Sequence, residues 1–407
     1  MLLPVDVRPF LLHDDDLVRE QALRYFTDAH DPTPVTAEDL WACVDRFASS
    51  RRSCLTALRS VPTTARSIDR LLEELRAFPA ADHPERWPLA RLARDLPPEA
   101  ARRALADEAI AGRLPEDVAA SMARTVALSE RPFHQLLEAL RTQVAAMDED
   151  ETPGSPAFQA CEDIVSALAR HPAEAATWAL DCLRGRRESA AELGSLHLFA
   201  LGLFRLVPLP ASCAVLLDHI GDEEGDVECE YAEDALVKLG DDQVIRGIES
   251  RFLGADSAFQ IYTTGALSRI KRPASEEALS RLLGAGADVN IDTALADALC
   301  NLCTTSPQAL ERMSRMVLED AYDPMISDLA EALIATGHMV GWSPPDPAAW
   351  RAAAARRRRD RELWQRAKEQ EMKSWRSAKS RAPAAGEKAR KAIVFKPYGK
   401  KAKKKRK

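Results

Sequence analysis

The chain has 407 residues, of which 46% are hydrophobic but only 6% aromatic, and its formal net charge is −7. Its apolar content is therefore mainly Ala, Leu and Val, which is typical of a helix-rich soluble protein. The most apolar stretch, 193–217, is interrupted by Arg205 and two prolines and falls short of the ~20 apolar residues of a membrane span. The first residues lack the basic and apolar blocks of a signal peptide. We expect a cytoplasmic protein with no membrane partner.

The small net charge conceals an uneven distribution along the chain. Residues 1–150 hold 19 basic and 26 acidic side chains, and residues 151–350 hold 14 and 32, a net charge of −18. Residues 351–407 hold 23 basic and 5 acidic side chains, a net charge of +18. The sequence therefore predicts an acidic body joined to a basic C-terminal segment.

Residues 1–147 predict an irregular helical region. Near its start, the acidic turn Asp14–Asp16 precedes Val18-Arg19 and then Ala22-Leu23. Thr36 and Asp39 have the spacing of a capping box at the start of a helix. Further helices are expected over 68–78, 100–111, 116–128 and 133–147. The charged segment 148–156, which contains two prolines and a glycine, predicts a linker.

Residues 157–340 carry an internal repeat. A small residue followed by Leu recurs toward the end of successive helical segments, with a second apolar helix in each interval. The six pairs are Ala167-Leu168, Gly202-Leu203, Ala235-Leu236, Ala266-Leu267, Ala298-Leu299 and Ala332-Leu333. The steps between the leucines are 35, 33, 31, 32 and 34 residues. A period of this length predicts stacked two-helix units.

The small-Leu pairs have a physical reason in such an array. Ala or Gly lets neighbouring helix backbones approach closely, and Leu fills the layer between them. The pattern resembles the HEAT-like α-helical repeats, including the bacterial PBS-lyase-type form, and Val18-Arg19 and Ala22-Leu23 resemble the start of one more unit. The resemblance implies an all-α protein built as an α-solenoid of stacked antiparallel helix pairs, and a bacterial source is expected.

The C-terminal segment predicts a long basic helix over 346–380 and a disordered Lys-rich tail over 381–407. Asp346 and Pro347 have the residue types that start a helix. Trp350, Trp364 and Trp375 lie within about 40° of one another on a helical wheel. We interpret this stripe as the surface by which the helix docks on the last repeat, capping the array.

Two charged clusters are the candidate binding sites. Basic side chains of the C-terminal segment have the clustering that neutralises phosphates. The candidate polyanion-binding residues are Arg356, Arg357, Arg358, Arg359, Lys396, Lys400, Lys401, Lys403, Lys404, Lys405, Arg406 and Lys407. The segment 218–234 holds nine acids and no Lys or Arg, which indicates a solvated rim or a docking patch for a cationic partner. The candidate docking residues are Asp222, Glu223, Glu224, Asp226, Glu228 and Glu230.

Motifs for enzymatic chemistry are absent from the sequence or isolated in it. Cys300-x-x-Cys303 has no second ligand pair for zinc, so core packing is favoured. Ser268-x-x-Lys271 lacks the companion motifs of serine acyl enzymes. The eight cysteines are scattered along the chain and are interpreted as reduced. We therefore expect no catalytic residue, no metal and no cofactor.

These observations favour a non-enzymatic helical-repeat scaffold or adaptor. Its repeat surface would bind a protein partner, and its basic tail would engage RNA, DNA or another polyanion. One alternative is a nucleic-acid enzyme on the same fold, since HEAT-like repeats include DNA-base glycosylases. A second is an interaction module autoinhibited by its own tail, because segments 151–350 and 351–407 carry opposite charges of equal size.

Overall fold

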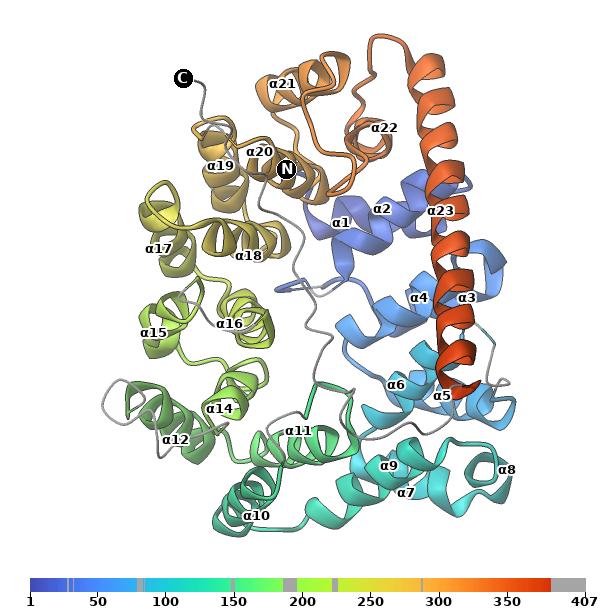
Figure 1. Cartoon of the computed structure of the whole chain (residues 1–407), viewed down its shortest axis with the longest axis vertical. Coiled ribbons are helices and arrows are strands. Elements are labelled where there is room, and N and C mark those ends of the chain that lie inside the picture. Colours follow the sequence, from blue (N-terminus) through green and yellow to red (C-terminus); the bar gives the residue numbers. More distant parts are fainter. Residues whose placement is uncertain are drawn as a thin grey trace. The chain divides into compact units, whose positions relative to one another are not determined.

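The computed structural model describes residues 1–27, 29–31, 33–78, 83, 85–147, 151–185, 196–221, 226–286 and 288–381. The chain divides into two compact units, Met1–Arg351 and Ala352–Lys407, called unit 1 and unit 2 below. Every element within the described ranges is a helix (Figure 1). The prediction of an all-α protein is confirmed.

The first part of unit 1 consists of short helices joined by tight turns. In chain order they are α1 (Pro4–Val7), η1 (Arg8–Leu12), α2 (Asp16–Phe26), α3 (Ala37–Arg46), η2 (Ala48–Ser50), α4 (Arg51–Ala57), η3 (Leu58–Ser60), α5 (Ala65–Arg76), α6 (Arg86–Arg94), α7 (Pro98–Ala106), α8 (Glu108–Ala111), α9 (Glu116–Leu128) and α10 (Phe133–Ala145). The segments labelled η are 3₁₀ turns, which commonly connect or extend α-helices.

The second part of unit 1 covers the region of the sequence repeat. Its helices are α11 (Pro156–Leu168), α12 (Pro172–Gly185), α14 (Leu196–Phe204), η4 (Pro210–Ser212), α15 (Cys213–Asp218), α16 (Asp226–Leu239), α17 (Asp242–Phe252), α18 (Ser257–Arg269), α19 (Pro273–Leu282), α20 (Val289–Asn301), α21 (Pro307–Leu318) and α22 (Leu329–Val340). Helix α23 (Pro347–Arg381) begins in unit 1 and continues into unit 2.

Local capping explains where many of these helices begin. Asp241 and Asp256 each accept a hydrogen bond from the backbone N–H three residues later, as N-cap residues do. Ser155 caps α11 in the same way, directly before Pro156. At the start of α3 the Thr36 backbone N–H donates to the Asp39 carboxylate at 2.9 Å. The capping box predicted there is confirmed.

Ten helices of unit 1 pack side by side in a closed cycle. In order, each contacts the next: α2, α4, α6, α9, α11, α14, α16, α18, α20, α22 and again α2. Other helices pack against members of the cycle. For example, α3 packs on α4, and α19 packs on α18 and α20. Figure 1 shows the sequence-coloured ribbons of unit 1 returning to their starting point, where α2 meets α22.

Hydrogen bonds fasten the N-terminal segment to α18 and to the end of α20, and so help to close the cycle. The backbone N–H of Leu2 donates to the carbonyl of Cys303 at 3.0 Å. The Gln21 side chain, which is buried, donates to the carbonyl of Cys300 at 2.9 Å. The backbone N–H of His30 donates to the carbonyl of Arg269 at 2.9 Å. Because buried backbone groups need partners, these bonds satisfy both sides of the junction.

The small-Leu pairs of the sequence repeat lie on α11, α14, α16, α18, α20 and α22, which are consecutive members of the cycle. All twelve residues are buried. Gly202 shows why a small residue is needed, since a Cβ at this position would lie 3.1 Å from the ring of Tyr231 on the neighbouring helix α16. The repeat therefore marks the helix–helix interfaces of this half of unit 1.

The segment 148–156 lies between two helices that touch. Residues 148–150 fall outside the described ranges, and the turn that follows leads into α11, which packs on α10.

Unit 1 has two hydrophobic cores. The first, called the main core below, includes Leu136 and Leu140 of α10 and extends to Trp350. A second core spans Val7 to Met122 and includes Cys303 and Met339 from the far end of unit 1.

Candidate functional site

Only one of the two basic clusters of the C-terminal segment lies within the described residues. Arg356, Arg358 and Arg359 are exposed on α23, and Arg357 is partly buried. The remaining candidates, Lys396, Lys400, Lys401, Lys403, Lys404, Lys405, Arg406 and Lys407, lie outside the described residues. The four arginines are consecutive, so they spread around the helix instead of lining one face.

The Trp stripe that we predicted as a docking surface is only partly buried. Trp350 at the start of α23 is 6% exposed and belongs to the main core of unit 1. Trp364 is 54% exposed and stacks with Lys368, whose Nζ lies 4.5 Å from the ring centre. Trp364 belongs to unit 2, so its docking on unit 1 stays a prediction. The side chain of Trp375 lies outside the described residues.

Part of the acidic candidate patch is engaged within unit 1. Asp222, Glu223 and Glu224 lie outside the described residues. The carboxylate of Asp226 accepts a hydrogen bond from the hydroxyl of Tyr262 at 3.3 Å, and Glu228 lies 3.2 Å from the imidazole of His197. Glu230 is exposed.

A network of charged side chains, which the sequence did not reveal, connects α11, α14, α16 and α18. Arg205, directly after α14, pairs with Asp234 at 3.2 Å and lies over the ring of Tyr231 at 4.2 Å. The Tyr231 hydroxyl donates to Glu162 of α11 at 2.6 Å. Arg269 of α18 pairs with Asp234 at 2.7 Å. The network alternates cations and anions, which lowers the cost of holding each charge away from water.

Glu233 is the most buried charged side chain of this network. It is paired with Arg269 at 3.2 Å, and its side chain is 15% exposed. A Cβ on Gly265 of α18 would lie 2.3 Å from its carboxylate, so a glycine leaves room for it. Burial outweighs the attraction of Arg269 and raises the pKa of Glu233 to about 7.

Arg91 on α6 belongs to the same electrostatic environment. Burial lowers its pKa, and the positive charges of Arg59 and Arg205 lower it further, against the attraction of Asp95 and Glu162. Its guanidinium lies 4.8 Å from the ring centre of Trp87, which is 55% exposed. An exposed tryptophan beside a guanidinium is suited to contact a planar or anionic group. Neither residue was a sequence candidate, because a single Trp-x-x-x-Arg spacing is common on helices.

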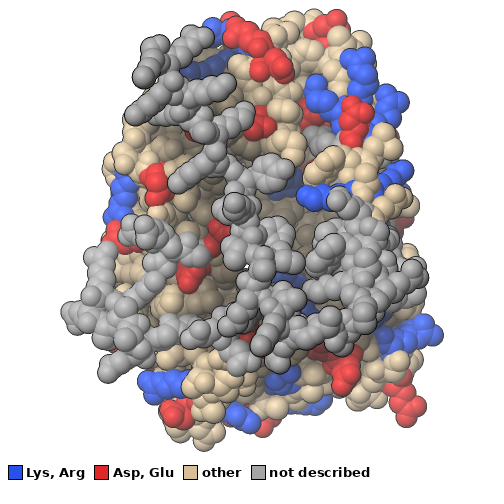
Figure 2. Space-filling view, viewed as in Figure 1, with Lys and Arg blue, Asp and Glu red and all other residues tan. Residues whose placement is uncertain are grey.

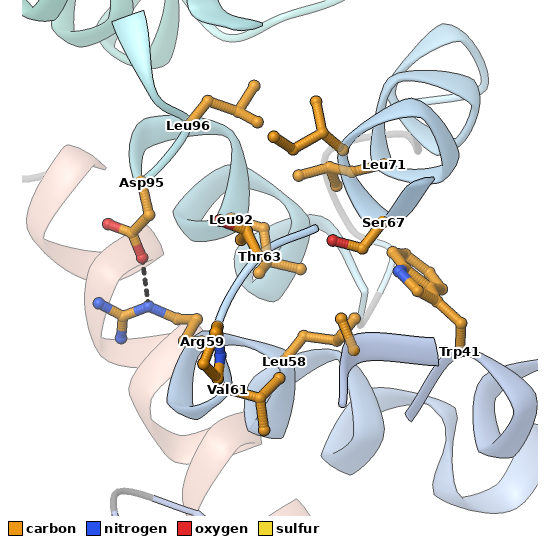
Figure 3. Close-up of a pocket in the computed structure, with 13 residues that line it drawn as sticks. Trp41, Leu58, Arg59, Val61, Thr63, Ser67, Leu71, Leu92, Asp95 and Leu96 are labelled. Atoms are coloured by element: carbon orange, nitrogen blue, oxygen red, sulfur yellow. Dashed lines mark hydrogen bonds and ion pairs between the residues drawn. The ribbon is translucent and has the colours of Figure 1, made fainter. Parts of the chain in front are cut away.

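A pocket of about 290 Å³ opens between α3, α5 and α6. Leu58, Leu71 and Leu92 line it, and Figure 3 shows Arg59 and Asp95 joined by an ion pair at its edge. The indole N–H of Trp41, in the pocket wall, has no hydrogen-bond partner among the described residues. The pocket is small for a ligand site, and its lining suits an aliphatic or aromatic group.

The two short motifs have structural roles. Cys300 and Cys303 are both 0% exposed, so the prediction of core packing is confirmed. Lys271 of the Ser268-x-x-Lys271 motif is buried, and its ammonium donates to the carbonyls of Ser268 and Asn301 at 2.7 and 3.1 Å. It also lies 4.3 Å from the ring centre of Tyr25 on α2, so it helps to close the cycle.

The described residues show neither a metal-ligand cluster nor a membrane-spanning helix. No cluster of three or more His, Cys, Asp or Glu side chains there could hold a metal ion. Within the same ranges, no helix has both the length and the apolar character to cross a membrane.

In Figure 2 the basic and acidic side chains that are coloured are intermixed over the visible face.

Comparisons with known proteins give no family. No family model matches the chain, and no curated protein matches it. Among solved structures, an engineered protein from a structural genomics consortium aligns with 16% sequence identity and a TM-score of 0.29, over 83% of this chain and 98% of that chain. A likeness at this TM-score carries no argument about fold or function.

Proposed function

We propose that the chain is a non-enzymatic HEAT-like repeat adaptor that binds nucleic acid through its basic C-terminal segment. The observation that carries this proposal is the charge of the two units. Unit 1 holds 34 basic and 58 acidic residues, a net charge of −24, and unit 2 holds 22 and 5, a net charge of +17. A polyanion is attracted to unit 2 and repelled by most of unit 1.

The exposure of the arginines on α23 supports this binding mode. Arg356, Arg358 and Arg359 present their guanidinium groups on a helix of 35 residues. Each phosphate neutralised by such a group releases condensed counterions, so binding would be salt-dependent and largely independent of base sequence. Trp364, exposed two turns further along, would stack on an unpaired base.

We assign unit 1 the role of binding a protein partner. Its two-helix units and buried small-Leu pairs support a HEAT-like repeat array, a class of fold that commonly presents extended binding surfaces. Leu318, Met325 and Ile326, around the turn between α21 and α22, are 59%, 79% and 44% exposed. Met325 and Ile326 are adjacent in the chain, and adjoining exposed apolar side chains are typical of an interaction surface.

The nucleic-acid role can be tested with full-length protein and a labelled single-stranded oligonucleotide at low salt. Replacement of Arg356, Arg358 and Arg359 by Gln should weaken retention at least several-fold, because three phosphate contacts are lost. Replacement of Arg102, Arg103 and Arg281 by Gln is the matched control. Their side chains are 54%, 60% and 57% exposed and lie on unit 1.

Circular dichroism must be unchanged in both triple variants for the comparison to hold. Equal retention by the two variants would overturn the assignment to α23.

Affinity capture from a lysate, with and without nuclease, then separates nucleic-acid binding from the binding of a protein partner. A protein that remains bound after nuclease treatment supports the partner surface on unit 1, and loss of every captured protein argues against it.

A further inference from the structure

Two cysteine thiols lie unusually close together in the corner between α3 and α4. Cys43 is on α3 and Cys54 is on α4, and their sulfur atoms are 2.7 Å apart. Non-bonded heavy atoms settle about 3.5–4.0 Å apart, whereas bonded sulfur atoms in a disulfide are about 2.05 Å apart. The two side chains are therefore oriented toward each other at a separation between that of a disulfide bond and that of ordinary packing.

Three contacts of other cysteines are of ordinary length. Cys161 lies 3.5 Å from the sulfur of Met147, and Cys300 lies 4.0 Å from that of Met313. Cys229 lies 4.0 Å from a backbone carbonyl. The close approach of Cys43 and Cys54 is thus a local feature of the α3–α4 corner and does not extend to the cysteines as a group.

The surroundings of the pair favour reaction at Cys43. The Cys54 thiol donates to Cys43, which lowers the pKa of Cys43 and raises that of Cys54. The guanidinium of Arg19, fully buried and bonded to Ser50 at 2.8 Å, also favours the Cys43 thiolate, whereas burial and the charge of Glu20 oppose it. A thiolate beside a second thiol is the arrangement that forms a disulfide through a sulfenic acid.

We propose that Cys43 and Cys54 are a redox-active pair that a peroxide converts to an intramolecular disulfide. The Cys43 thiolate attacks one peroxide oxygen, so that an S–O bond forms, the O–O bond breaks, and the second oxygen leaves as water after taking up a proton. The sulfur of Cys54 then attacks Cys43, forming the S–S bond as the S–O bond breaks and a second water leaves. Two thiols are oxidised by two electrons, and one peroxide is reduced to two waters.

The disulfide would join α3 to α4 at the corner that carries the pocket. Trp41 precedes Cys43 on α3, and Leu58 follows α4, and both line the pocket. Both sulfur atoms are shielded, since each cysteine is 0% exposed. Reaction therefore requires a transient opening of this corner, and oxidation is expected to be slow in the folded protein and to raise its melting temperature once complete.

The test uses full-length protein treated with hydrogen peroxide, denatured with an alkylating reagent and digested with trypsin. Cleavage after Arg24, Arg46, Arg52 and Arg59 places the two cysteines in separate peptides, 25–46 and 53–59. We expect these peptides to be linked, with a mass two hydrogens below their sum, while the other six cysteines are alkylated. Reduction should restore the two separate peptides.

Two variants test which of the two cysteines reacts with the peroxide. Cys54→Ala should accumulate a sulfenic acid on Cys43 that dimedone traps, and Cys43→Ala should give much less on Cys54. Cys161→Ala is the matched control and should form the disulfide like the unaltered protein. Alkylation of all eight cysteines after oxidation, or linkage of Cys43 to a cysteine other than Cys54, would overturn the proposal.

Discussion

At the scale of single residues, the buried carboxyl group of Glu233 makes the stability of the folded protein depend on pH. Its pKa is raised from the ordinary value to about 7, mainly by burial. The folded protein therefore holds this proton more tightly than the unfolded chain does. The associated stability is complete at low pH and is lost as the pH rises from about 4.5 through 7, by up to about 3 kcal/mol.

Glu233→Gln removes this titration. We expect the variant to gain stability relative to the unaltered protein as the pH rises, so that the difference between them is more favourable to the variant at pH 8 than at pH 5. Urea denaturation at the two pH values measures this. Glu277→Gln, at a side chain that is 68% exposed, is the control and should leave the pH dependence unchanged. An unaltered dependence in Glu233→Gln would contradict the assignment.

Gly240, directly after α16, lies against His30 of the N-terminal segment, so its substitution tests this contact. Its φ of +52° lies in the left-handed region, and a Cβ there would be 2.1 Å from Nδ1 of His30. The same Nδ1 lies 2.9 Å from the carbonyl of Val237, so His30 cannot move away without losing this contact. Gly240→Ala should therefore lower the free energy of unfolding by about 2 kcal/mol or more.

Gly286→Ala is the control for a glycine that has neither a positive φ nor a neighbour within 4 Å of the added Cβ. It should change stability by less than about 0.5 kcal/mol. Denaturant unfolding of both variants gives the comparison. If Gly240→Ala is as stable as Gly286→Ala, the His30 contact does not hold the N-terminal segment against α16.

At the scale of elements, the sequence predicted most where local rules act. The small-Leu pairs located α11, α14, α16, α18, α20 and α22, because each pair fills an interface that every unit of the repeat must make. The Thr36–Asp39 capping box placed the start of α3 for a similarly local reason. Burial along α23 was not predictable in this way, because Trp350 and Trp364 share a helical face but are 6% and 54% exposed.

Substitution of each tryptophan by alanine measures this difference in burial. Trp350→Ala should destabilise the protein by about 3–5 kcal/mol, since its ring is removed from the main core. Trp364→Ala should be within about 0.5 kcal/mol of the unaltered protein. Thermal or urea unfolding of the two variants provides the measurement. A large loss in Trp364→Ala would mean that this side chain is covered.

At the scale of the whole molecule, the charge of each segment could be counted from the sequence, but the closed cycle could not be foreseen. The contacts that join α2 to α20 and α22 connect residues some 300 positions apart, and the residues involved, such as Gln21 of α2 and Cys300 of α20, follow no repeated spacing. The Arg205, Tyr231 and Glu162 network arises from the same long-range packing. No periodic pattern in the sequence identifies which side chains meet across such interfaces.

The central claim is that nucleic acid binds through phosphate contacts of the basic C-terminal segment. The most direct test is the slope of the logarithm of the association constant against the logarithm of salt concentration, for a single-stranded oligonucleotide and full-length protein. Each phosphate contact contributes about 0.7 to this slope. Replacement of Arg356, Arg358 and Arg359 by Gln should make the slope shallower by about 2, and the Arg102, Arg103 and Arg281 control should leave it unchanged. Equal slopes for the two variants, or a slope near zero for the unaltered protein, would contradict the claim.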